Sequence, residues 1–212
     1  MSPAKRRDRV HGLYAIADTS VLAPDQLMSA VQQAIAGGAR VIQFRDKGND
    51  SALRLQQALA LAGLCRKNDL VFIINDDAAL AKAVGADGVH LGRDDPGIKG
   101  ARELLGSQAL IGVSCYNEIG RARDASRDGA DYVAFGSFYP SNIKPDAVRA
   151  STELLHQASE ELDLPVVAIG GITPENGAEL VAAGADALAV ITGVFTADDI
   201  SQAAKQYATL FE

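Results

Sequence analysis

The chain has 212 residues, a formal net charge of −7 and a hydrophobic content of 48%. This apolar content excludes general disorder, and a chain of this length can bury one large core. The negative charge argues against non-specific binding to nucleic acid or to anionic membranes. An aromatic content of 5% without tryptophan argues against a surface that stacks bases. Any anionic ligand must therefore be held by a local group of cations or backbone dipoles.

The tail and the cysteines favour a cytoplasmic protein. Residues 1–10 are basic but are not followed by an apolar segment, so we expect a flexible tail rather than a secretory signal. Cys65 and Cys115 match neither a disulfide framework nor a metal-binding spacing, which fits a reducing compartment. No apolar run is long enough to span a bilayer. Residues 11–212 are predicted to form one catalytic domain, and the pattern indicates no particular oligomeric state.

A repeated pattern organises this domain. A Gly-Ala pair follows an Ala-rich helical stretch and precedes an apolar run at Gly38, Gly85, Gly129 and Gly184. Glycine commonly ends a helix in the left-handed conformation, so each pair marks a corner from helix to strand. The roughly even spacing leaves room for one more strand and helix between successive corners.

The predicted elements alternate strictly along the chain. The strands are short apolar runs, typical of strands buried on both faces: 12–17, 41–45, 70–75, 88–91, 110–114, 132–135, 165–169 and 187–191. The amphipathic helices are 24–36, 51–67, 78–84, 98–105, 118–128, 150–161, 174–183 and 198–211. Strict alternation favours parallel pairing with right-handed crossovers. We therefore predict an α/β fold, a single-domain (β/α)8 TIM barrel.

Chemistry in such a barrel lies at the carboxyl ends of the strands. Because alternate residues of a strand point the same way, Gln43, Arg45 and Lys47 are expected to share one side of the second strand. One amide and two cations suit a ligand that is planar at one end and polyanionic at the other. The alternative interpretation is a polar strand end that faces water.

Acidic residues follow the next two strands. Asp76 and Asp95 are hard oxygen ligands, and Mg²⁺ typically takes one or two carboxylates together with water and phosphate oxygens. With Arg45, Lys47 and Lys144 nearby, they suggest a site for magnesium and a diphosphate. Alternatively, Asp76 caps the helix that begins near residue 78 or pairs with a lysine.

A second anion site is predicted after the last two strands. Gly170-Gly171 precedes Thr173-Pro174, which places backbone N–H groups at a helix start. Ile191-Thr192-Gly193 on the eighth strand is the natural partner, because these two loops form the recurrent phosphate site of such barrels. His90 is the only histidine near the predicted rim, and we expect it to hydrogen-bond behind the site rather than to act as a general base.

Several ordered motifs resemble the thiamine-phosphate synthase (thiamine phosphate pyrophosphorylase) family over nearly the whole chain. They are Leu13-Tyr14-Ala15-Ile16-Ala17-Asp18, Gln43-Phe44-Arg45-Asp46-Lys47, Ile74-Asn75-Asp76, Gly88-Val89-His90-Leu91-Gly92 with Asp95, Gly112-Val113-Ser114, the loop 136–144, and Ala168-Ile169-Gly170-Gly171-Ile172.

The resemblance implies a transferase that joins hydroxymethylpyrimidine diphosphate to thiazole phosphate, through a pyrimidine cation, and releases pyrophosphate. Mg²⁺ would be bound by Asp76 and Asp95. The pyrimidine diphosphate would be held by Gln43, Phe44, Arg45, Asp46, Lys47, Asn75, Ser114 and Lys144, of which Arg45, Lys47, Ser114 and Lys144 would be catalytic. The thiazole phosphate would be held by Ser141, Asn142, Ile143, Gly171, Ile191 and Thr192.

The chain departs from the family pattern at two places. Where the family usually has Pro-Thr-x-Thr-Lys, this chain has Pro140-Ser141-Asn142-Ile143-Lys144, so one hydroxyl is missing. Arg93 stands where glutamine is usual. Two alternatives remain open: a thiazole tautomerase-like relative, which needs no site for magnesium and a diphosphate, and a non-catalytic barrel that binds thiamine phosphate.

Overall fold

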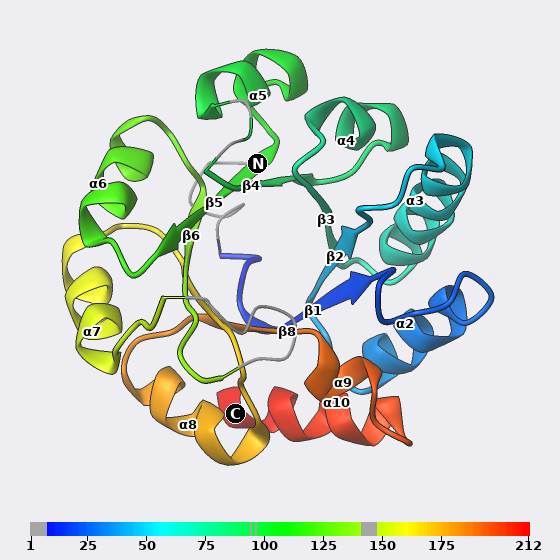
Figure 1. The fold of residues 1–212 in the computed structure, drawn as a ribbon. Coiled ribbons are helices and arrows are strands. Elements are labelled where there is room, and N and C mark those ends of the chain that lie inside the picture. Colours follow the sequence, from blue (N-terminus) through cyan, green and yellow to red (C-terminus); the bar gives the residue numbers. More distant parts are fainter. Residues whose placement is uncertain (1–7, 94, 96, 141–147) are drawn as a thin grey trace.

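The computed structural model describes residues 8–93, 95, 97–140 and 148–212. Eight parallel strands follow one another around a closed barrel, and helices surround it (Figure 1). The strands are β1 Gly12–Asp18, β2 Val41–Arg45, β3 Val71–Asn75, β4 Gly88–Leu91, β5 Leu110–Tyr116, β6 Tyr132–Phe135, β7 Val166–Ile169 and β8 Ala187–Val190. The predicted (β/α)8 TIM barrel is confirmed.

The barrel closes between its first and last strands. Gly12 of β1 lies opposite Ala187 of β8, and the same parallel register continues to Ala15 opposite Val190. Every pair of neighbouring strands is parallel, so all eight carboxyl ends meet at one rim. This rim is where the predicted site residues were expected to gather.

The helices of the described chain cover the outside of the barrel. They are α2 Leu27–Ala36, α3 Ser51–Lys67, α4 Ala78–Val84, α5 Ile98–Leu105, α6 Ile119–Arg127, α7 Thr152–Glu161, α8 Pro174–Ala182, α9 Thr192–Phe195 and α10 Ile200–Ala208, followed by the 3-10 turn η1 Thr209–Phe211. The short helix α9, directly after β8, was not predicted. None of the helices described is long and apolar enough to cross a membrane.

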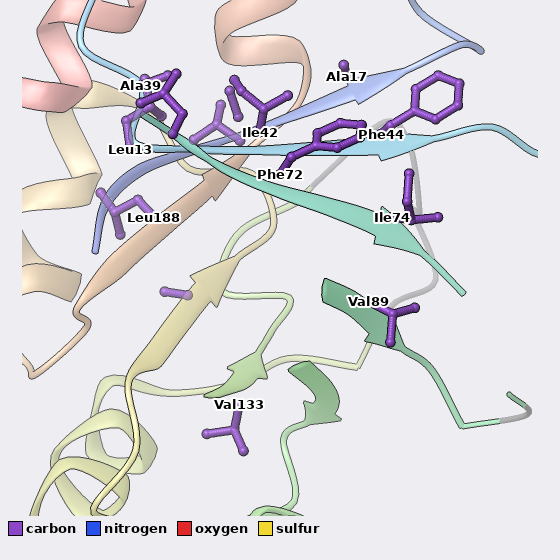
Figure 2. Packing of buried hydrophobic residues seen from close by; sticks show 14 of the residues in the cluster. Leu13, Ala17, Ala39, Ile42, Phe44, Phe72, Ile74, Val89, Val133 and Leu188 are labelled. Atoms are coloured by element: carbon purple, nitrogen blue, oxygen red, sulfur yellow. The ribbon is translucent and has the colours of Figure 1, made fainter. Parts of the chain in front are cut away.

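The core has two layers because successive side chains of a strand point to opposite faces. Residues inside the barrel, such as Val41 and Ile73, form one buried cluster. Residues between the strands and the helices form a larger one, of which Figure 2 shows Ile42, Phe44 and Phe72. Within β2, this alternation directs Gln43 to the inside of the barrel and Phe44 to the outside.

The repeated Gly-Ala motif connects neighbouring strands at the amino end of the barrel. In three of its four copies an aspartate follows. The Asp87, Asp131 and Asp186 carboxylates accept hydrogen bonds from the backbone N–H groups of Phe72, Ile111 and Val166, at 2.9, 3.0 and 2.7 Å. Each aspartate also donates its own N–H to the carbonyl of the same residue. The repeat therefore ties β3 to β4, β5 to β6 and β7 to β8.

Residues 8–10, which we predicted to be part of a flexible tail, pack against the barrel. Val10 is buried in the inner cluster. The Arg9 guanidinium lies 3.0 Å from the Asp87 carboxylate. Residues 1–7 lie outside the described chain. The segment 8–10 thus belongs to the amino end of the barrel rather than to a tail.

Candidate active site

A cavity of about 330 Å³ opens at the carboxyl rim of the barrel. All eight strands contribute to its wall, and so do the loops after β6, β7 and β8. Its polar side chains come from different strands, while Ile16, Val167 and Ile169 line it with apolar surface. A cavity of this size with an apolar wall and a few convergent polar groups is the usual form of a small-molecule site.

A chain of hydrogen bonds crosses the wall of this cavity. Gln43 Nε2 donates to the Tyr14 hydroxyl at 2.7 Å, and that hydroxyl lies 2.9 Å from the Tyr132 hydroxyl. The Tyr132 hydroxyl lies 3.1 Å from His90 Nδ1, and His90 Nε2 lies 2.9 Å from Ser114 Oγ. His90, which we expected behind the site, lines the cavity itself and hydrogen-bonds there to Tyr132 and Ser114. The two tyrosines were not identified as site residues from the sequence.

Arg45 lines the cavity at the end of β2 and is held by a buried partner. Its Nη1 atom lies 2.5 Å from Asp18 Oδ2, and Asp18 is only 1% exposed. The other Asp18 oxygen accepts from the backbone and the hydroxyl of Ser20. Because Asp18 fixes one side of the guanidinium, the remaining N–H groups are held in place for an anion in the cavity.

A smaller cleft of about 220 Å³ adjoins the main cavity, and Asn75 lines both. Lys47 lies in this cleft, beyond the last residue of β2, and its ammonium pairs with Asp76. Asn75 Nδ2 donates to the same Asp76 oxygen at 2.6 Å. Gln43 and Arg45 therefore share the main cavity, whereas Lys47 faces the neighbouring cleft.

Asp76 and Asp95 lie close to one another after β3 and β4. Burial, together with the nearby Asp76 carboxylate, raises the pKa of Asp95 above its ordinary value, although the Gly92 N–H donates to it at 2.6 Å. Asp76 does not cap α4: Asp77 does, accepting from the Leu80 N–H at 2.8 Å. No group of three or more His, Cys, Asp or Glu side chains that could hold a metal occurs among the residues described. Among the described residues, the carboxylates of Asp76 and Asp95 are therefore the candidate metal ligands.

The opposite side of the cavity is built from glycines and helix starts. Gly170 and Gly171 both have positive φ angles, and a Cβ on Gly171 would lie 2.3 Å from the Pro140 carbonyl oxygen. Only glycine fits this close approach. Helix α8 follows with a capping box between Thr173 and Asn176. Ile191 and Thr192, where α9 begins, line the cavity at the end of the neighbouring strand β8.

Comparison with known proteins assigns the chain to a family. Residues 13–194 match the family model described as thiamine monophosphate synthase. The chain belongs to this family. It is 50% identical to the thiamine-phosphate synthase of Nitrosococcus oceani over 202 residues, covering 95% of this chain and 93% of the relative. The thiamine-phosphate synthase of Thiobacillus denitrificans is 51% identical, covering 94% of each chain.

A solved structure gives the same result. The thiamine phosphate pyrophosphorylase from Pyrococcus furiosus superposes with a TM-score of 0.85 at 33% identity, covering 98% of this chain and 97% of that one. The resemblance identified from the sequence motifs is therefore confirmed as membership of the thiamine monophosphate synthase family.

Two predicted residues of this family member, Phe44 and Asp46, lie away from the main cavity. Phe44 packs in the outer layer of the core and reaches the smaller cleft only. Burial acts to raise the pKa of Asp46, but hydrogen bonds from Thr19, Gly48 and Arg54 lower it below its ordinary value. Asp46 thus holds the loop after β2 in place.

Four predicted residues, Ser141, Asn142, Ile143 and Lys144, lie outside the described part of the chain. The residues on either side of them are tied together beside the cavity. Ser137 N–H donates to the Val148 carbonyl at 2.9 Å, and Ala150 N–H donates to the Ser137 carbonyl at 3.0 Å. Ser137 and Val148 both line the cavity. The departure from Thr-x-Thr therefore falls in a segment that begins and ends at the cavity wall.

The other departure, Arg93, makes its contacts with neighbouring side chains. Its guanidinium pairs with Glu118 and lies 4.8 Å from the centre of the Tyr116 ring. Tyr116 in turn lines the cavity. Arg121 also contacts β5, because its Nε donates to the Ser114 carbonyl at 2.7 Å. Arg93 therefore contributes to the support of Tyr116 and β5.

Proposed function

We propose that this protein is a thiamine-phosphate synthase, a transferase that joins hydroxymethylpyrimidine diphosphate to thiazole phosphate and releases pyrophosphate. One observation carries the proposal: the rim cavity has polar side chains and Arg45 on its wall and glycines with helix starts after β7 and β8, and the cleft that adjoins it at Asn75 holds Lys47 and Asp76. Relatives with this activity in their names match the chain over almost their full length.

Asp76 and Asp95 are the residues proposed to hold Mg²⁺. Burial and the neighbouring Asp76 carboxylate raise the pKa of Asp95, and a cation bound between the two carboxylates would offset both effects. One or two carboxylates suffice for Mg²⁺ when phosphate oxygens and water complete its shell. When bound, the ion would neutralise charge on the diphosphate.

The side chains are proposed to act mainly on the leaving group. The bond between the exocyclic methylene and the diphosphate oxygen breaks, and the diphosphate leaves with the electron pair. Arg45, fixed by Asp18, donates hydrogen bonds to the departing oxygens, and Lys47 and Lys144 add positive charge. Preorganised donors aimed at developing charge are commonly the largest catalytic contribution.

The cation left on the pyrimidine is stabilised by its amino group, and the thiazole nitrogen then forms the new bond to the methylene carbon. Gln43, Asn75 and Ser114 would hold the pyrimidine, while Gly171, Ile191 and Thr192 would hold the thiazole phosphate. Holding both substrates in one cavity can supply about 7–11 kcal/mol of the barrier reduction. The apolar wall also keeps water from the reactive cation.

A direct assay tests the proposal. Purified protein is mixed with both substrates and Mg²⁺, and thiamine phosphate and pyrophosphate are measured together, with a matched reaction containing a chelator in place of the metal. We expect both products in equal amounts only with the metal. Folded protein that binds thiamine phosphate but makes none would instead identify a binding barrel. Conversion of a thiazole precursor alone would indicate the tautomerase-like alternative.

A further inference from the structure

The hydrogen-bond chain in the cavity wall is buried along most of its length. Tyr14, Gln43 and Tyr132 are 1%, 3% and 0% exposed. The chain joins five strands, from β2 through β1 and β6 to β4 and β5. Because a buried hydroxyl proton needs an acceptor, the direction of donation along the chain is constrained by the number of partners at each step.

The direction is set at the first tyrosine. Among the described residues, the partners of the Tyr14 hydroxyl are Gln43 and Tyr132. Gln43 donates through Nε2, so the single Tyr14 proton goes to the Tyr132 oxygen. The Tyr132 proton then goes to its remaining side-chain partner in that set, His90 Nδ1. Burial raises the pKa of both tyrosines, which keeps both protons in place.

The same logic fixes the far end. With Nδ1 accepting, a neutral His90 carries its proton on Nε2 and donates to Ser114 Oγ, 2.9 Å away. The Ser114 proton is then directed to another acceptor, and Ser114 lines the cavity. At the near end, one N–H of the Gln43 amide donates to Tyr14, which fixes the orientation of the amide and presents its carbonyl oxygen as an acceptor for a ligand.

We propose that Tyr14 and Tyr132 are positioning residues that set the hydrogen-bond polarity of the ring site, with Gln43 accepting and Ser114 donating. This role rests on the proposed function, and it explains how the site would select a 4-aminopyrimidine ring. The amino group of that ring is a donor and its ring nitrogens are acceptors, which complements the two ends. A 4-oxopyrimidine presents an acceptor and a protonated ring nitrogen, and so opposes both.

The two ends are coupled by the chain between them. Turning the Gln43 amide over would make its carbonyl accept from Tyr14, and every later bond would reverse until Ser114 accepted from the ligand side. Both tyrosine hydroxyls are needed for the orientation of the Gln43 amide to determine whether Ser114 donates or accepts. Removing either one uncouples the ends, so the ring site no longer favours one donor and acceptor pattern over the other.

The tautomer of His90 gives a test that needs no activity. The chain has three histidines, so nitrogen NMR of the imidazoles at about pH 8, where ordinary histidine is neutral, is readily assigned with His11→Gln and His156→Gln variants. We expect the His90 proton on Nε2 and a shift of the Nδ1 signal in Tyr132→Phe. A proton on Nδ1 in the unaltered protein would overturn the assigned direction.

Ring discrimination gives the second test. Dissociation constants are measured for the 4-amino and the 4-oxo pyrimidine diphosphates, and for inorganic pyrophosphate, without thiazole phosphate. We expect the unaltered protein to prefer the amino ring by about tenfold or more, the effect of one to two hydrogen bonds. Tyr14→Phe and Tyr132→Phe should each lose most of this ratio, with pyrophosphate affinity unchanged.

Tyr207→Phe is the matched control, because it removes another buried tyrosine hydroxyl, bonded to the Ile172 carbonyl at 3.0 Å, outside the chain. It should keep the ratio. If the protein makes thiamine phosphate and the Tyr14 and Tyr132 variants keep the ratio too, the inference is wrong while the proposed function stands. Absence of product in the direct assay contradicts the function separately. Should one tyrosine variant fail to fold, the other decides.

Discussion

The two ends of the barrel use charged side chains in opposite ways. At the amino end, Asp87, Asp131 and Asp186 repeat one arrangement, each accepting from the N–H of the neighbouring strand. At the carboxyl rim the polar side chains in the cavity differ from strand to strand, such as Arg45 on β2, Asn75 on β3 and Ser114 on β5. Repetition thus marks the residues that close the barrel, and its absence marks those that line the cavity and that we propose bind the substrates.

The amino end should fail by unfolding, and this is the largest effect we expect. Asp131→Ala removes an acceptor that is bonded by Ile111 N–H and by Arg102, leaving a partly buried arginine without its carboxylate. Breaking such a pair costs about 3–5 kcal/mol of the free energy of unfolding. Urea denaturation measures the loss. Turnover per folded molecule should be unchanged; a selective loss of turnover would break the division between the two ends.

The carboxyl rim should fail by losing activity. Lys47→Ala removes an ammonium whose side chain is 59% exposed, so its ion pair with Asp76 contributes little to folding, at most about 1 kcal/mol. If Lys47 stabilises the leaving diphosphate, kcat/KM for the pyrimidine substrate should fall about tenfold to a hundredfold. Arg123→Ala, which breaks a surface pair with Glu161, is the control and should leave both quantities unchanged. Equal behaviour of the two variants would remove Lys47 from the mechanism.

A change at Gly170-Gly171 should mainly affect binding of the second substrate, thiazole phosphate. Gly171→Ala places a Cβ 2.3 Å from the Pro140 oxygen at a positive φ, so the loop must shift. We expect KM for thiazole phosphate to rise severalfold while KM for the pyrimidine changes less. Gly63→Ala at an exposed position of α3, where a Cβ meets nothing within 4 Å, is the matched control. It should raise the free energy of unfolding by about 0.5–1 kcal/mol.

The smallest expected effect concerns pH at the amino end. Burial raises the pKa of Asp186, although the Val166 N–H and His11 lower it in part. A raised carboxyl pKa in the folded state means that folding stability falls as pH rises from the ordinary value through the folded one. Asp186→Asn retains an acceptor for Val166 and should flatten this fall. Thermal unfolding between mildly acidic and neutral pH measures it, and an unaltered slope would assign the fall to other groups.

Sequence reasoning located elements well where local chemistry marks their ends. Helices α3 and α4 begin and end as predicted, with Asp50 and Asp77 as caps and Gly85 in the left-handed conformation after α4. Helix α9 was missed because four residues are too few to show a helical period. The strand ends identified Gln43, Arg45 and Ser114 as cavity residues because they break apolar runs.

Contacts between side chains on distant strands could not be predicted from the residue pattern along the chain. The Tyr14 and Tyr132 hydroxyls meet although 118 positions separate them, and each residue alone is typical of a buried strand. Their pairing depends on the closure of β1 against β8, which decides which inner side chains face one another. Asp46 shows the converse: the family resemblance implied that it holds a substrate, whereas in the structure its carboxylate accepts hydrogen bonds from Thr19, Gly48 and Arg54.

The buried contact between Arg45 and Asp18 has a consequence for the reaction cycle. Asp18 is sealed from solvent, one of its oxygens holds the Arg45 guanidinium and the other accepts from Ser20, so this contact does not depend on a ligand. The Arg45 guanidinium, which we propose stabilises the leaving group, is therefore in position before any substrate arrives. The entropy of ordering it is lost once, when the protein folds, and does not recur with each turnover.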